Sequence, residues 1–111
     1  MANAYKVLGQ ANLTAETLTD VYTVPASTEA VISTIIIANL LGTANTFRIA
    51  IRPNGAAISN QHYMAYDVAL AANDSTTLTL GVTLDAADVV SVYSGASADV
   101  SVSIFGTEIT A

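Results

Sequence analysis

The chain has 111 residues, enough for one domain, and it is 52% hydrophobic but only 11% charged. Three Lys and Arg against nine Asp and Glu give a net charge of −6. Three cations are too few to form a basic surface that binds nucleic acid. The apolar content argues against disorder, and the absence of Cys excludes disulfides, thiol nucleophiles and thiolate zinc sites.

The N-terminal residues have no pattern of a targeting or membrane segment. Residues 1–8 lack a basic start followed by a long apolar stretch. The most apolar run, residues 31–41, is far shorter than the roughly 20 residues of a membrane-spanning helix. We expect synthesis in a host cytoplasm and no membrane partner. Residues 1–16 are less regular than the rest, and we expect them to form an arm that reaches a neighbour.

A period of two dominates the rest of the chain, as in strands with one buried and one wet face. Turn residues (Asn, Asp, Gly and Pro) separate the alternating segments. Strands are predicted at 5–9, 17–24, 29–40, 45–53, 62–70, 76–84, 88–94 and 99–108. Seven or eight short strands without a helix indicate an all-β fold. We expect one domain over residues 1–111, an antiparallel β-sandwich that is jelly-roll-like or immunoglobulin-like.

Residues 31–37 are apolar on both alternating faces. In a regular strand one face carries Val31, Ser33, Ile35 and Ile37, and the other carries Ile32, Thr34, Ile36 and Ala38. One interpretation is a central strand covered by a second layer. The other is a strand whose outer face packs on another subunit, because large exposed apolar patches mark interfaces. On the second interpretation, Ile32 and Ile36 are candidate interface residues.

The strand at 45–53 carries two of the three cations. Arg48 and Arg52 are four residues apart and therefore share a face, where they can bind carboxylates of this chain or of a neighbour. The alternative is solvent-facing charge that prevents aggregation. Tyr63 is a further candidate for such a contact, since Tyr is enriched at interfaces. In a regular strand Tyr63 and Tyr66 would face opposite sides, so only one would join a given patch.

The sequence offers little catalytic chemistry. His62 is the single His, and no Gly-x-Ser-x-Gly elbow accompanies it, so we expect a locally hydrogen-bonded His rather than a triad member or zinc ligand. Asp85 and Asp88 resemble a carboxylate pair, but Asp is also a common turn former, which we prefer here. We expect no enzyme activity, no catalytic residue, no cofactor and no metal.

Short blocks along nearly the whole chain resemble small virion proteins of tailed bacteriophages. The blocks are Val7-Leu8-Gly9-Gln10, Val21-Tyr22-Thr23-Val24-Pro25, Thr46 to Ile51, Asn60 to Val68, Thr76 to Gly81, Asp88 to Tyr93 and Phe105-Gly106-Thr107-Glu108. The resemblance implies a β-sandwich structural protein of the phage particle. It transfers no functional residues.

The resemblance implies a virion location but leaves head or tail open. Our leading hypothesis is a capsid decoration (cement) protein that binds the major capsid protein and stabilises the head. We also expect a homo-oligomer, with a trimer favoured, and no nucleic-acid partner. One alternative is a tail, tail-fibre or baseplate component, with other virion proteins as partners. Another is a glycan-binding attachment module that would use exposed aromatics such as Tyr63 or Tyr93.

Overall fold

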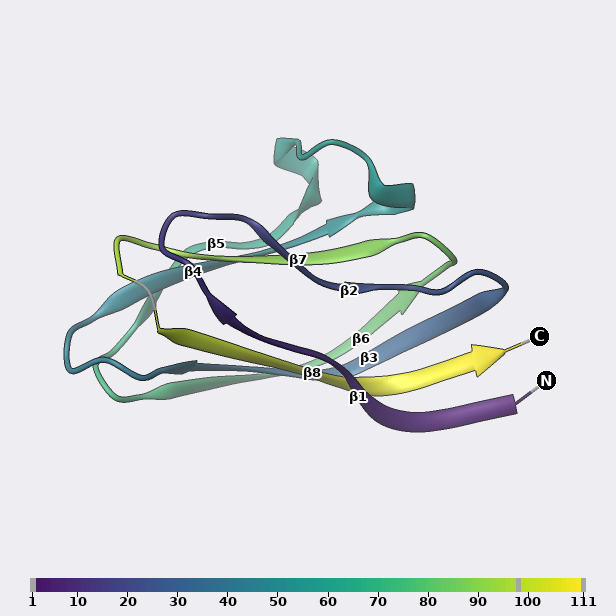
Figure 1. The fold of residues 1–111 in the computed structure, drawn as a ribbon, viewed down its shortest axis with the longest axis horizontal. Helices are drawn as coiled ribbons and strands as arrows, with labels where there is room; N and C mark the ends of the chain where they lie inside the picture. The colour runs from purple at the N-terminus through teal and green to yellow at the C-terminus, as the bar shows by residue number, and fades with distance from the viewer. Residues whose placement is uncertain (1, 98, 111) are drawn as a thin grey trace.

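The computed structural model describes residues 2–97 and 99–110, which form eight strands and the turns and loops that connect them (Figure 1). The strands are β1 (Ala2–Leu13), β2 (Thr19–Thr23), β3 (Thr28–Asn39), β4 (Asn45–Arg52), β5 (Tyr63–Leu70), β6 (Ser75–Leu84), β7 (Val89–Ser94) and β8 (Val100–Thr110). Two single 3-10 turns, η1 (Pro53–Gly55) and η2 (Asn60–His62), lie between β4 and β5. All eight predicted strands are present and seven have nearly the predicted limits, whereas β1 extends over Ala2–Leu13 instead of residues 5–9.

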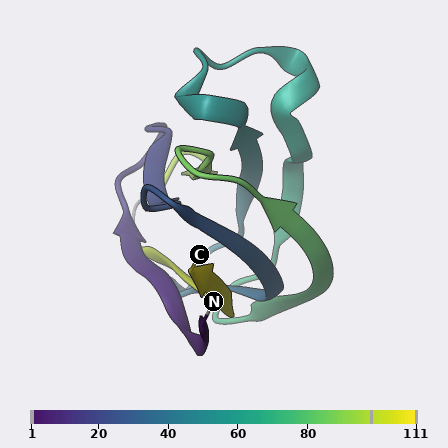
Figure 2. The same ribbon diagram turned by 90° about the vertical axis from the view of Figure 1, so that its right-hand side faces the viewer.

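The strands form two four-stranded antiparallel sheets that pack face to face (Figures 1 and 2). The first sheet has the order β1-β8-β3-β6 and the second the order β2-β7-β4-β5. Strands β1 and β8, β2 and β7, β3 and β6, and β4 and β5 are therefore partners, as in a long hairpin that is rolled over itself. This arrangement is a jelly roll, and it decides between the two predicted sandwich types.

The core between the sheets is built from the inward positions of the alternating strands. Buried Ile, Val and Phe side chains fill it, and burying each contributes about 1.5–3 kcal/mol. Those with at most 1% exposure include Ile32, Ile35, Ile37, Phe47, Ile49, Val90, Val92, Val102 and Ile104. Within residues 2–97 and 99–110, no helix is long and apolar enough to cross a membrane.

Strand β3 contains an irregularity that changes the predicted faces. Its register against β8 shifts between Ile32 and Thr34, where Ser33 is an extra residue in β3. Against β6 the register shifts at the same place, and there β6 supplies two residues opposite Ser33. Ile32 consequently faces the core together with Ile35, whereas Ile36 faces outward. The prediction that Ile32 and Ile36 share an outer face is wrong, because the bulge reverses the alternation between them.

The predicted N-terminal arm is also corrected. Met1 lies outside the described residues, but Ala2–Leu13 form β1 and pair with β8 along its whole length, from Ala2 opposite Thr110 to Leu13 opposite Val100. This pairing places the two ends of the chain side by side (Figure 2). Residues 2–13 are therefore an edge strand of the sandwich.

Candidate functional site

Four adjacent rows on the outward face of the first sheet contain no charged residue. Its strands align in four rows that cross β1, β8, β3 and β6 in that order. The rows are Tyr5-Thr107-Val31-Thr83, Val7-Phe105-Thr34-Thr79, Gln10-Ser103-Ile36-Thr77 and Asn12-Ser101-Ala38-Ser75. We call these residues the uncharged face. Glu29, opposite Ile109, lies in the row beyond its end.

The outward face of the second sheet carries Arg48 and Arg52, as predicted, and both are paired within the chain. Arg48 donates to both carboxylate oxygens of Asp67, at 2.6 Å from Nε and 3.3 Å from Nη2. Its guanidinium also lies over the rings of Tyr66 and Tyr93, 4.1 and 4.3 Å from their centroids. The hydrogen bond with Asp67 raises the pKa of Arg48, despite an opposing contribution from burial. Arg48, Tyr66, Asp67 and Tyr93 form what we call the Arg48 cluster.

The backbone of β5 brings Tyr66 and Asp67 to this cluster. Its register against β4 shifts twice, between Phe47 and Ile49 and again between Ile49 and Ala50, so β5 contains extra residues. Asp67 has a φ of 51°, a left-handed conformation that is uncommon outside Gly. Such bulges redirect side chains away from strict alternation.

Tyr63 and Tyr66 consequently lie together. Their rings meet edge to face, with centroids 4.9 Å apart. The expectation of opposite sides is wrong, since it assumed a regular strand. The two rings and Asn60 of η2 line an open hollow of about 480 Å³, which we call the aromatic hollow. Its volume lies within the range of small-molecule sites.

Arg52 binds the loop formed by residues 53–62 to the second sheet through hydrogen bonds. Its Nη1 donates to the carbonyls of Gly55 and Ala56, while its Nη2 donates to Asp20 at 2.7 Å. Ser91 completes the network by accepting from Arg52 Nε and donating to Asp20. The loop stands above β4 and β5 in Figure 1. Arg52 therefore positions the segment that contributes Asn60 to the aromatic hollow.

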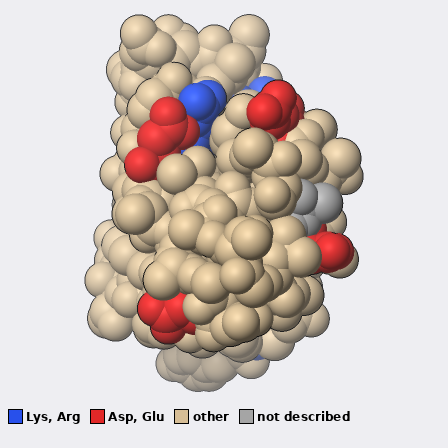
Figure 3. All heavy atoms as spheres, turned by 90° about the vertical axis from the view of Figure 1, so that its left-hand side faces the viewer, with Lys and Arg blue, Asp and Glu red and all other residues tan. Residues whose placement is uncertain are grey.

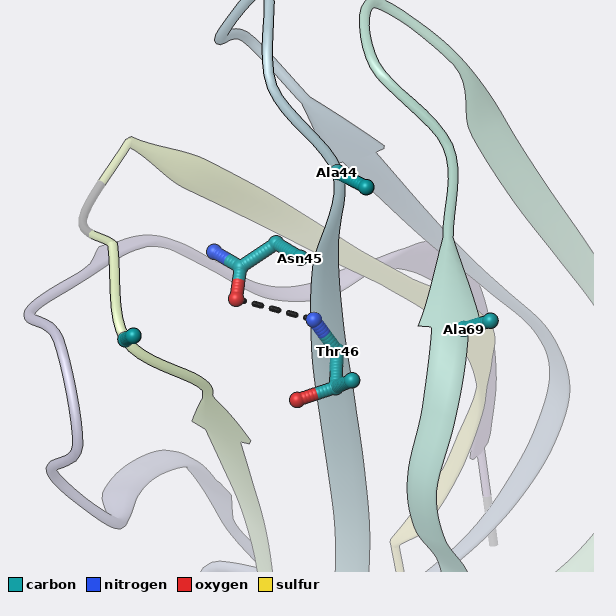
Figure 4. A pocket seen from close by; sticks show the side chains of 5 residues that line it. Ala44, Asn45, Thr46 and Ala69 are labelled. Carbon is teal, nitrogen blue, oxygen red and sulfur yellow. Dashed lines mark hydrogen bonds between the residues drawn. The ribbon is translucent and has the colours of Figure 1, made fainter.

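A second hollow, of about 420 Å³, is lined by small side chains and part of the β4 backbone (Figure 4). Its residues are Ala44, Asn45, Thr46, Ala69 and Ala96. Asn45 accepts from the backbone N–H of Thr46 through Oδ1 and donates to the carbonyl of Ser97. Because its amide already makes these bonds within the chain, Asn45 serves the local structure.

The other residues considered from the sequence have local roles. His62 accepts a hydrogen bond from the backbone N–H of Ser59 through Nδ1, as expected for a loop histidine. Asp88 accepts from the N–H groups of Asp85 and Asn54, which confirms a turn-forming carboxylate. Over residues 2–97 and 99–110, no three His, Asp or Glu side chains gather as metal ligands would.

The structure separates the five predicted interface residues into three places. Ile32 is in the core, Ile36 is on the uncharged face, and Arg48, Arg52 and Tyr63 are on the second sheet. Asp67 and Asn60 were not singled out from the sequence. The sequence did contain a signal for Asp67, because it follows a Tyr in a predicted strand next in sequence to the strand that carries Arg48. It contained no signal for Asn60, because the path of the loop decides where that residue lies.

Comparison of the chain with protein-family models, with curated proteins and with solved structures finds no significant match in any of the three. Charged groups are few at the end of the molecule drawn in Figure 3, and the Lys and Arg atoms visible near the top of that view lie beside Asp and Glu atoms.

Proposed function

We propose that this protein is a non-catalytic structural protein of a tailed-phage particle, a capsid decoration protein that binds the shell through its uncharged face. The observation that carries the proposal is the composition of that face. Its four rows contain no Asp, Glu, Lys or Arg, although the chain has a net charge of −6. Depletion of charge is the compositional mark of an interface core.

The size of the uncharged face supports the same role. Strands lie about 4.8 Å apart and residues on one face about 6.8 Å apart, so four strands by four rows cover roughly 500 Å². With an equal area from the partner, the contact buries about 1,000 Å², which is the lower limit for a specific protein interface. Many copies on one particle would add to the strength of attachment.

Sedimentation with purified shells of the phage that encodes the chain tests the proposal. Thr77→Lys places a charge on the uncharged face, and Ala72→Lys places the same charge on an exposed loop as a matched control. We expect the wild type and Ala72→Lys to sediment with the shells and Thr77→Lys to bind at least about tenfold more weakly. Equal binding of the two variants, or no binding of the wild type, would refute the proposal.

The number of bound copies distinguishes the head from the tail. Saturation at hundreds of copies per particle supports a decoration protein, whereas a few dozen or fewer supports a tail or baseplate component. The predicted homo-oligomer is measured on the free protein by analytical ultracentrifugation. A species of three times the monomer mass is the expected result for a trimer.

A further inference from the structure

We propose that the aromatic hollow on the second sheet is a binding site for a neutral saccharide. The site is formed by Tyr63, Tyr66 and Asn60, and it lies on the opposite side of the sandwich from the uncharged face. This inference is independent of the proposed role in a particle.

The aromatic side chains are held in place before any ligand binds. Tyr66 contacts the Arg48 guanidinium, which is fixed by two hydrogen bonds to Asp67 and also lies over the Tyr93 ring. Tyr63 contacts Tyr66 edge to face. A binding group whose conformation is already fixed loses little entropy when the ligand arrives.

The backbone next to the hollow is irregular. Two bulges interrupt β5, and Asp67 adopts a positive φ although it is not Gly. Bulges and such strained residues collect near functional sites, where they redirect a side chain. Here they bring Tyr66 and Asp67 over Arg48 and place Tyr66 next to Tyr63.

The chemistry of the lining matches a sugar ring. A pyranose has an apolar face of C–H groups that packs on the electron-rich face of an aromatic ring, and hydroxyls around its edge. The Asn60 amide offers both a donor and an acceptor for those hydroxyls. A few polar groups beside aromatic surface are typical of small-molecule sites.

Charge selects a neutral ligand over an acidic one. The Arg48 guanidinium is neutralised by Asp67, and Arg52 is neutralised by Asp20, so neither cation remains to bind a carboxylate or sulfate. The chain as a whole has a net charge of −6 and repels anions.

NMR titration of the full chain with methyl β-galactoside, methyl β-glucoside and methyl α-mannoside tests the proposal, with N-acetylneuraminic acid as the acidic probe. We expect saturable shifts of the Tyr63 and Tyr66 ring signals with at least one neutral glycoside, at a dissociation constant of about 1 mM. No saturable shift with any of the three, or tighter binding of the acidic probe, would overturn the proposal.

Substitutions locate the binding. Tyr66→Phe keeps the ring and should retain binding, whereas Tyr66→Ala should weaken it at least about tenfold. Tyr5→Ala is the matched control, because Tyr5 is an exposed tyrosine of the first sheet, with 82% of its surface accessible. Unchanged amide spectra away from the hollow establish that each variant folds. Wild-type affinity of Tyr66→Ala, or loss of binding in Tyr5→Ala, would contradict the assignment.

Arg48 is a positioning residue in this scheme. Tyr93→Ala removes the second ring that Arg48 contacts and leaves the three lining residues of the hollow unchanged. We expect the variant to bind the same glycoside more weakly and to broaden the Tyr66 ring signal. A sharp Tyr66 signal together with unchanged affinity would show that the Arg48 cluster does not hold the site.

Discussion

Arg48 and Arg52 form ion pairs within the chain, although the sequence also allowed them to bind a partner. Each guanidinium reaches a carboxylate from another strand, Asp67 for Arg48 and Asp20 for Arg52. A guanidinium is planar and presents several donors, so it can also bind carbonyls or stack on rings at the same time. These two cations therefore fix the loop and the tyrosines of the second sheet, and we do not expect them to bind a partner's carboxylates.

Glu108 has a carboxylate whose pKa is shifted by its neighbours. Its carboxylate accepts from Lys6 Nζ at 2.8 Å and from Tyr22 Oη at 2.6 Å. The hydrogen bond from Lys6, followed by that from Tyr22, lowers the pKa of Glu108. Burial, followed by the hydrogen bond to Glu108, raises the pKa of Tyr22. The group links β1, β2 and β8 at one end of the sandwich.

The Glu108 carboxylate should make stability depend on pH in the acid range. A lowered native pKa contributes stability above the ordinary Glu value of about 4.3, and the contribution is lost as the pH falls through the native pKa. Glu108→Gln should therefore cost about 1–2 kcal/mol of unfolding free energy at pH 7, and the cost should be smaller at pH 3. Urea denaturation at both pH values measures this.

Glu16→Gln is the control for that measurement, because Glu16 is exposed on a loop. We expect it to leave the unfolding free energy unchanged at pH 7. If Glu108→Gln destabilised the protein equally at pH 7 and pH 3, the effect would come from packing and not from the carboxylate charge.

At the scale of strands, regular alternation was readable from the sequence and interruptions of it were not. In strand β6, Leu78, Leu80 and Val82 pack against the core as the period of two predicts, although its register against β3 shifts. Strands β3 and β5 contain bulges, which displaced the predicted faces of Ile32 and of Tyr66. A bulge depends on how many residues the neighbouring strands supply opposite it, which no local pattern encodes.

The close approach of β8 to β3 requires a glycine. A Cβ at Gly106 would overlap the carbonyl oxygen of Val31, which belongs to the backbone of the adjacent central strand and cannot move aside freely. Gly106→Ala should therefore lower the unfolding free energy by about 2–4 kcal/mol. Gly81→Ala is the matched control in β6, because no atom lies within 4 Å of its added Cβ.

Both glycine variants are measured by urea denaturation. Gly81→Ala should change the unfolding free energy by less than about 1 kcal/mol. Equal effects of the two substitutions would mean that the general preference for Ala over Gly in strands, rather than the contact with Val31, decides stability at Gly106.

At the scale of the whole molecule, the two outward faces have different compositions. The first sheet presents the uncharged face, and the second presents the ion pairs, the Arg48 cluster and the aromatic hollow. The few charged residues of the chain are therefore distributed unevenly between the two outward faces. A molecule that attaches by one sheet leaves the other accessible, which is compatible with both proposals.

Removing β1 tests whether the first strand belongs to the fold. Deletion of residues 2–12 leaves β8 as an unpaired edge and removes Leu8 and Ala11, which pack against the core. We expect this variant to aggregate and to lose cooperative thermal unfolding, as followed by circular dichroism and gel filtration. Deletion of residues 2–4, which are exposed, should preserve cooperative unfolding. A folded, monomeric 2–12 deletion would restore the interpretation of an arm.

The sequence by itself determined the fold class, the approximate limits of seven of the eight strands and the turn roles of Asp85 and Asp88. These properties follow from a local period of two and from turn chemistry, and short segments contain both. Only the tertiary structure decided between the jelly-roll and immunoglobulin-like orders, placed Ile32 in the core and joined Asn60, Tyr63 and Tyr66. Each of those depends on pairing between strands distant in the chain. Strand order and bulges arise from the fit of one strand to another, so they exist only once the sheets have formed.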